Sequence, residues 1–232
     1  MPIRIIFFWT PAIATGILQS CIDDSRIDVV AVVAQPDRVW WRWRQMLEPE
    51  TKKLAIQHRI PCHQPEKIRK NKEFHATLEQ YGADYFVVCA YGKILPKVVL
   101  DIPKKHCLNI HFSDLPEYRG MAPVQFALLD GIDRTAIAIQ IMAEGMDEGD
   151  VVATLSVEIG MFDTTWTLFA RCGELAGPFF VETLHGLHSW VLVPTPQDHT
   201  QATYTSRIEK EHGLLDPHKP VQENFSRWKA YT

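Results

Sequence analysis

Asn109 and His111 stand two positions apart near the end of a short apolar run, which leads into a turn that ends at Gly120. Residues two apart on a strand point to the same face, so these side chains would lie side by side. An amide donor and an imidazole placed there can bind the oxygen of a polarised carbonyl and move a proton beside it. The alternative interpretation is a hydrogen-bonded core histidine next to a turn-forming asparagine, which needs no ligand.

An acidic turn offers a third group for the same chemistry. Asp147 lies between two glycines, just after an apolar stretch at 135–142 that is predicted to be a strand. Ligands of open α/β sheets gather beyond the carboxyl ends of the strands, so we expect Asp147 within a few ångströms of Asn109 and His111. A carboxylate at that distance would favour the protonated form of His111 and could relay a proton through water.

The elements that would position these groups alternate between strands and helices. Apolar runs at 3–8 and 28–34, with a helix at 11–23 between them, have the pattern of parallel strands joined by a right-handed crossover. Further strands are predicted at 60–62, 84–90, 107–110, 135–142 and 150–159, and further helices at 49–58, 71–81, 123–129 and 164–184. We therefore expect the α/β class, with a Rossmann-like, mostly parallel twisted sheet and helices on both faces.

Composition limits the classes of function. The chain has 232 residues, a formal net charge of −4 and 46% hydrophobic residues, so there is material for a core but no overall attraction to nucleic acid. Five cysteines without paired spacing do not form a disulfide framework, and Cys89 and Cys107 are expected as buried thiols. Without a signal peptide or a long apolar run, we expect a cytoplasmic protein that does not bind a membrane.

An unusual tryptophan- and arginine-rich stretch follows the second predicted strand. Its residues are Arg38, Trp40, Trp41, Arg42, Trp43 and Arg44. In one interpretation the indoles pack on the protein and the arginine stems lie across them. In the other, guanidinium groups contact phosphates and indoles stack on unpaired bases at the end of a nucleic acid.

Other chemistry-bearing residues have simpler interpretations. Ser113 lies in a turn without a partner spaced for nucleophilic catalysis, so its hydroxyl is expected to cap the backbone. The histidine pairs 58/63 and 185/188 lack the cysteines or carboxylates of a known metal site, and no metal is expected.

Two motifs together resemble the folate-dependent formyltransferases. The first is Asn-x-His-x-Ser-x-Leu-Pro at 109–116, followed by a glycine, and the second is the Gly-hydrophobic-Asp-x-Gly turn at 145–149. The methionyl-tRNA formyltransferase branch is resembled in particular at 34–38, 64–67, 90–96, 119–125, 194–197 and 202–204. The resemblance covers nearly the whole chain.

The resemblance implies transfer of a formyl group from 10-formyltetrahydrofolate to the amino group of methionyl initiator tRNA, through a tetrahedral intermediate, at the start of protein synthesis. Asn109, His111 and Asp147 would be catalytic, and the loop at 38–44 would enter the acceptor arm of the tRNA. The residues implied in folate binding are Tyr91, Gly92, Ile94, Leu95, Ser113, Leu115 and Pro116.

Some features depart from the pattern of that family. Trp9 occupies a position where a glycine is usual, which puts access to the pocket in doubt. We expect a catalytic domain at 1–193 and a closing segment with a shortened tail at 194–232, without the tRNA-binding barrel of full-length relatives, in a monomer. Two alternatives stay open: formylation of a small amine, such as an amino sugar on a nucleotide, and a non-catalytic protein that keeps the fold.

Overall fold

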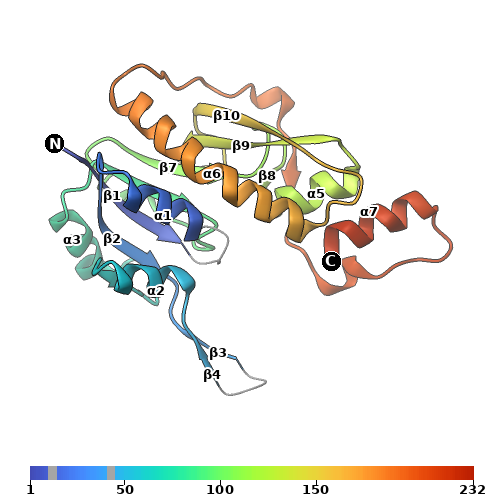
Figure 1. The fold of residues 1–232 in the computed structure, drawn as a ribbon, viewed down its shortest axis with the longest axis horizontal. Helices are drawn as coiled ribbons and strands as arrows, with labels where there is room; N and C mark the ends of the chain where they lie inside the picture. The colour runs from blue at the N-terminus through green and yellow to red at the C-terminus, as the bar shows by residue number, and fades with distance from the viewer. Residues whose placement is uncertain (10–14, 41–44) are drawn as a thin grey trace.

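A seven-stranded sheet forms the centre of the structure, a computed structural model that describes residues 1–9, 15–40 and 45–232, with only the backbone at 38–40 and 45–47 (Figure 1). The strand order is β10-β9-β7-β6-β1-β2-β5. The strands are β1 (Ile3–Trp9), β2 (Ile27–Ala34), β5 (Cys62–His63), β6 (Tyr85–Cys89), β7 (His106–His111), β9 (Arg134–Ile141) and β10 (Val151–Glu158). The pairs β5–β2, β2–β1, β1–β6 and β6–β7 are parallel, and β9 is antiparallel to both of its neighbours. The predicted α/β class with a mostly parallel sheet is therefore confirmed.

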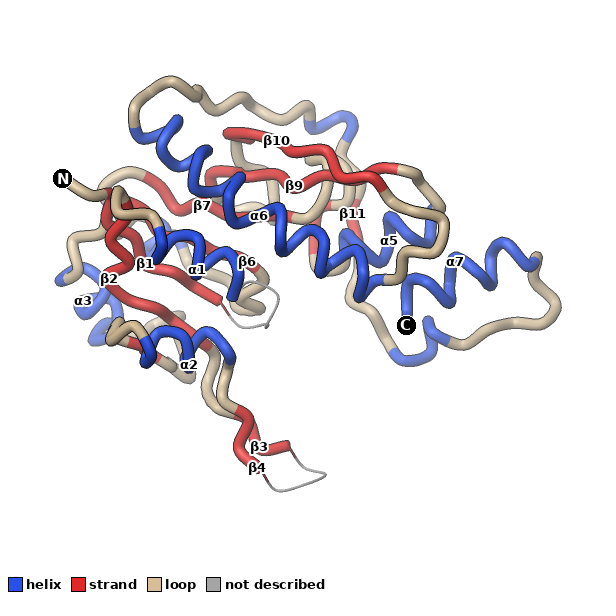
Figure 2. Tube along the Cα trace, in the orientation of Figure 1, coloured by secondary structure: helices blue, strands red, loops and turns tan. Residues whose placement is uncertain are grey.

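Helices cover both faces of this sheet, because its strands are apolar on both sides. Along β1, Phe7 belongs to one hydrophobic cluster and Phe8 to the other. The first cluster is covered by α1 (Thr15–Asp23), α2 (Glu50–Gln57), α5 (Pro123–Asp130) and the long α6 (Thr165–His188). The second is covered by α3 (Lys72–Gln80) and α4 (Lys97–Leu100). Figure 2 shows α1 and α6 on the same side of the sheet.

Several elements were not predicted. β3 (Arg38–Trp40) and β4 (Gln45–Leu47) form an antiparallel hairpin that extends away from the sheet (Figure 1). β8 (Arg119–Gly120) pairs in parallel with β11 (Tyr204–Thr205), which brings the segment after α6 back to the loop after β7. The last helix, α7 (Val221–Tyr231), packs against α5.

Trp9 lies in the core at the end of β1, with no exposed surface and its ring stacked on that of Phe7 at 5.8 Å. The cysteines Cys89 and Cys107 are buried free thiols, as predicted. Burial raises the pKa of both thiols, so they are neutral at pH 7. In the described part of the chain, no helix has both the length and the apolar character needed to cross a membrane.

Candidate active site

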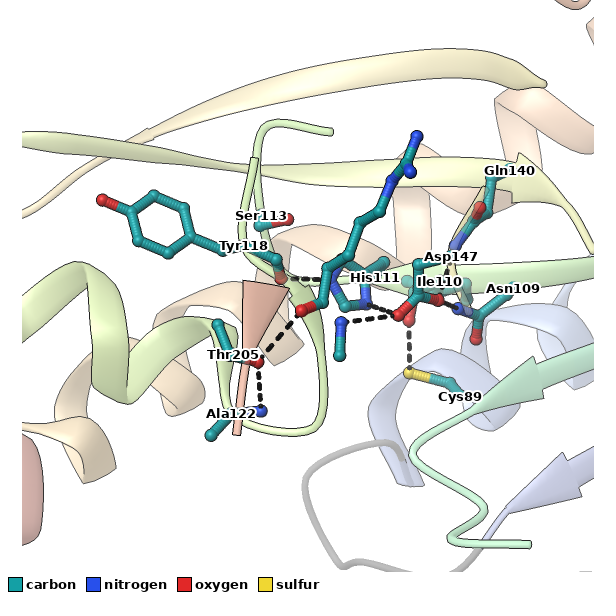
Figure 3. A network of polar contacts seen from close by, with 12 residues as sticks. Cys89, Asn109, Ile110, His111, Ser113, Tyr118, Ala122, Gln140, Asp147 and Thr205 are labelled. Atoms are coloured by element: carbon teal, nitrogen blue, oxygen red, sulfur yellow. Dashed lines mark hydrogen bonds and ion pairs between the residues drawn. The ribbon is translucent and has the colours of Figure 1, made fainter. Parts of the chain in front are cut away.

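The candidate site lies at the carboxyl end of β7, beside the turn that follows β9 (Figure 3). β7 ends at His111, and its residue Asn109 is paired with Gln140 on β9. The chain then leaves β9 and forms the turn that carries Asp147, whose backbone φ is +54°. Aspartate tolerates this left-handed conformation better than most residues, because its short polar side chain can hydrogen-bond locally.

Asn109, His111 and Asp147 converge, as the sequence predicts. The side-chain amide of Asn109 donates to Asp147 Oδ1 at 3.1 Å, and His111 Nδ1 lies 3.6 Å from Asp147 Oδ2. The side chains of His111 and Asp147 are only 7% and 15% exposed. Charges in such a partly dry place interact more strongly than they would in water.

The hydrogen bonds of His111 define which ring nitrogen can take part in chemistry. Nε2 lies 3.0 Å from the backbone carbonyl oxygen of Tyr118. A carbonyl oxygen can only accept, so Nε2 carries a hydrogen. The other ring nitrogen, Nδ1, faces the Asp147 carboxylate.

Backbone groups fix the other side of the Asp147 carboxylate. The N–H of Gly120 donates to Asp147 Oδ2 at 2.9 Å. Gly120 has a φ of +113°, and a Cβ there would come within 2.6 Å of the Thr205 carbonyl oxygen, so only glycine fits. A Cβ on Gly149 would lie 1.6 Å from the Ile141 carbonyl oxygen, which explains why the Asp147 turn needs glycine there.

Gln140 is a site residue that sequence reasoning missed. It is 1% exposed, and its side-chain amide donates to Asp147 Oδ1 at 2.8 Å. The available signal was a lone amide inside an otherwise apolar strand.

Arg119 is the second residue that was missed, and it connects the site to the segment after α6. Its guanidinium is 1% exposed and donates to Gln197 Oε1 at 2.7 Å and to the Tyr204 hydroxyl at 3.1 Å. The amide of Gln197 in turn donates to the carbonyl oxygens of Asp147, at 2.9 Å, and of Gly149, at 2.7 Å. The Asp147 turn is thus held from outside by residues 50 positions further along the chain.

The predicted folate-binding residues fall into two groups. Buried against the protein are Tyr91, Leu95, Ser113 and Leu115, whereas Gly92 is exposed, Pro116 is half-buried and Ile94 is 81% exposed. The Ser113 hydroxyl donates to the Glu117 carbonyl oxygen at 2.6 Å, so it caps the turn, as expected from its position. The amide of Gln35 donates to the Tyr91 carbonyl oxygen at 2.7 Å and fixes the base of the loop after β6.

An open surface depression of about 400 Å³ adjoins this loop and is lined by residues 67–70, Lys93 and Ile94. Asn109, His111 and Asp147 are not among its lining residues. We therefore locate the candidate site by the convergence of side chains and not by the depression. Across residues 1–9, 15–40 and 45–232, no group of three or more histidines, cysteines and acids could hold a metal ion.

The tryptophan- and arginine-rich stretch is only partly covered by the structure. Arg38 and Trp40 belong to β3, where Arg38 lies at the base of the hairpin and Trp40 at its far end, and Trp41, Arg42, Trp43 and Arg44 lie outside the described residues. The base is fixed to the body because Asp37 pairs with Lys52 on α2 at 2.6 Å and accepts from Gln64 at 2.6 Å.

Comparisons with known proteins identify the family of this chain. Residues 3–184 match the family described as formyl transferase. A methionyl-tRNA formyltransferase of Synechococcus sp. (strain JA-2-3B'a(2-13)) is 40% identical over 230 residues, which are 99% of this chain and 71% of the relative. A methionyl-tRNA formyltransferase of Caldicellulosiruptor saccharolyticus is 38% identical over 226 residues, which are 97% of this chain and 72% of the relative.

Solved structures share the fold. The N-formyltransferase from Helicobacter canadensis, in complex with folinic acid and dTDP-3-aminofucose, is 18% identical, with a TM-score of 0.74 over 100% of this chain and 81% of that one. Glycinamide ribonucleotide transformylase 1 from Symbiobacterium toebii is 20% identical, with a TM-score of 0.70 over 85% of this chain and 95% of that one. The chain belongs to the formyl transferase family and, within it, to the branch of the methionyl-tRNA formyltransferases.

Proposed function

We propose that this protein transfers a formyl group from 10-formyltetrahydrofolate to the amino group of methionyl initiator tRNA. The observation that carries the proposal is the convergence of an amide, an imidazole and a carboxylate on one desolvated point, with Asp147 3.1 Å from Asn109 and 3.6 Å from His111. Acyl transfer needs these groups: a donor for the carbonyl oxygen, a proton acceptor and a fixed charge.

The loop after β6 fits a flat heterocycle such as the pterin of a folate. Ile94 presents an aliphatic side chain to solvent, and Gly92 beside it is exposed. The hydrogen bond from Gln35 to the Tyr91 carbonyl holds the loop in place before a ligand arrives. Mostly apolar contacts with a few placed polar groups are typical of cofactor pockets.

When bound, 10-formyltetrahydrofolate would supply the formyl group: the acceptor amine bonds to the formyl carbon, the bond from that carbon to the folate nitrogen breaks, and one proton passes from the amine to that nitrogen. Asn109 donates one amide hydrogen to Asp147, and its second, which has no partner among the described residues, would stabilise the charge that develops on the formyl oxygen. The pair formed by His111 Nδ1 and Asp147 Oδ2 would relay the proton that the amine loses to the folate nitrogen, and the carboxylate would stabilise the charged imidazole during this transfer. The Tyr118 carbonyl keeps the ring oriented through this exchange.

The segment after α6 would complete the acceptor side. Gln197 and Arg119 connect it to the Asp147 turn. These contacts support the predicted division into a catalytic domain at 1–193 and a closing segment at 194–232. The arginines and tryptophans at 38–44 would contact the acceptor arm of the tRNA. A cytoplasmic location and a monomeric state stay predictions.

Single-turnover formyl transfer tests the proposal. Purified protein would be mixed with 10-formyltetrahydrofolate and methionyl initiator tRNA, with wild type compared against His111→Ala and His75→Ala. His75 is a matched control, since it is 8% exposed where His111 is 6%, and its Nε2 also contacts a backbone carbonyl, that of Ile68 at 2.8 Å. We expect a loss of at least about 100-fold in His111→Ala and a near-normal rate in His75→Ala.

Two other outcomes would change the assignment. Folate binding without transfer to the tRNA would indicate that the acceptor is a small amine, such as a nucleotide-linked amino sugar. Neither binding nor transfer would leave a protein that keeps the fold without the activity.

A further inference from the structure

Gln140 is a buried polar residue in a place where an apolar one would pack without cost. It lies on β9 between Ile139 and Ile141, and it is 1% exposed. Its partner across the antiparallel pair is Asn109 on β7, so the two amides lie on the same face of the sheet. Removing an amide from water is unfavourable unless its hydrogen bonds are replaced, and here the replacement is incomplete.

Only one end of this amide has a partner. Nε2 donates to Asp147 Oδ1 at 2.8 Å, whereas Oε1 receives no hydrogen bond from any residue in the described part of the chain. The orientation is forced, because an amide oxygen turned toward a carboxylate oxygen would be repelled. Gln140 therefore keeps a buried acceptor without a donor in order to place a donor on Asp147.

That donor completes the set that fixes the carboxylate. Oδ1 accepts from Gln140 and Asn109, and Oδ2 accepts from the Gly120 N–H and lies beside His111 (Figure 3). With Gln140 removed, Asn109 would be the one side-chain donor to Oδ1 among the described residues. Its amide could then turn toward the carboxylate and lose the direction of its second hydrogen.

We infer that Gln140 is a positioning residue for formyl transfer, which holds Asp147 so that the carboxylate stays beside Nδ1 of His111 and the second amide hydrogen of Asn109 faces the reacting group. This inference rests on the proposed function of the same site. In this role Gln140 acts through Asp147, to which its amide donates.

The test compares Gln140→Met, which keeps the length of the side chain but removes the donor, with Thr135→Val as a control. Thr135 is also on β9 and is 2% exposed, and its hydroxyl has no partner in the part of the chain that the structure describes. It lies five residues, or about 16 Å, from Gln140 along the strand. We expect kcat to fall about 10- to 100-fold in Gln140→Met, with KM for the folate within about twofold of wild type. Thr135→Val should change neither constant.

A double variant separates positioning from general damage. If Gln140 acts through the arrangement of Asp147 and Asn109, Gln140→Met should cost much less in an Asn109→Ala background than in wild type. Full additivity, or an unchanged kcat in the single variant, would overturn the inference.

A spectroscopic measurement keeps the inference testable if the acceptor is not the proposed tRNA. In the free protein, the ¹⁵N resonance of His111 Nδ1 should shift in Gln140→Met and stay in place in Thr135→Val, because the carboxylate that Nδ1 faces has moved. An unshifted resonance would refute positioning whatever the acceptor. A shifted resonance in a protein that formylates neither acceptor would reject the proposed function, but it would still support the inference that Gln140 positions Asp147.

Discussion

Asp147 and Asp163 are two carboxylates held in the same way but by different partners. Each accepts from a glycine N–H, that of Gly120 at 2.9 Å for Asp147 and that of Gly160 at 2.7 Å for Asp163. The remaining partners of Asp147 are two neutral amides and the His111 ring. Asp163 instead receives both arms of the Arg171 guanidinium, at 2.7 and 2.8 Å, and the Thr167 hydroxyl at 2.9 Å.

The difference lies in whether the charge of the carboxylate is neutralised by its partners. A guanidinium fork neutralises a carboxylate and locks it, which suits Asp163 before the first turn of α6. Neutral amides fix the direction of Asp147 without cancelling its charge. The proposed function uses this charge beside the ring of His111, whose Nδ1 lies 3.6 Å away.

The largest effect should follow from removing the charge of Asp147. Asp147→Asn keeps the shape of the side chain, but Asn109 and Gln140 would then face an amide in place of a carboxylate. We expect kcat for formyl transfer to fall about 1,000-fold, while the melting temperature changes little. Single-turnover kinetics and thermal unfolding on the same preparation would check this. A rate within tenfold of wild type would mean that Asp147, like Asp163, is structural.

Asp163→Asn should show the opposite pattern. The guanidinium of Arg171 would lose both of its hydrogen bonds to a carboxylate, and we expect the free energy of unfolding to fall by about 2 kcal/mol. The rate of formyl transfer should stay within about twofold of wild type, because no described contact joins Asp163 to Asn109, His111 or Asp147. Urea unfolding with the slope held constant gives the first quantity. An equally large loss of rate would show that the two carboxylates are coupled.

The sequence predicts the features of the site that depend on local patterns along the chain. Alternation on β7 places Asn109 and His111 on one face, and the glycine-flanked turn after an apolar strand places Asp147 near them. The main strands and helices follow from periodicity and caps, as where Gly131 ends α5 in a left-handed conformation.

Contacts between distant segments were beyond that reasoning. The bond from Arg119 to Gln197 joins residues 78 apart, and no periodic pattern indicates such a pairing. The same holds for α7, whose pattern is largely polar and whose position depends on packing against α5. The sequence could have indicated Gln140 as a site residue, because an amide in an apolar strand needs a hydrogen-bond partner. It could not have indicated that the partner is Asp147, in the turn after the strand.

The smallest expected effect is on the pH dependence of the free energy of unfolding, and it depends on Asp163 and not on Asp147. Burial acts to raise the pKa of Asp163, but the hydrogen bonds from Arg171, Gly160 and Thr167 outweigh it, and the pKa lies below its usual value of about 3.9. The pairing therefore contributes its full stabilisation above about pH 4, and the stabilisation is lost as pH falls through the pKa of the folded state. We expect the free energy of unfolding to drop more steeply between pH 5 and 2 in wild type than in Asp163→Asn. Parallel curves would mean that the Arg171 fork adds nothing to the ionised form, and the contrast between the two carboxylates would then rest on Asp147 alone.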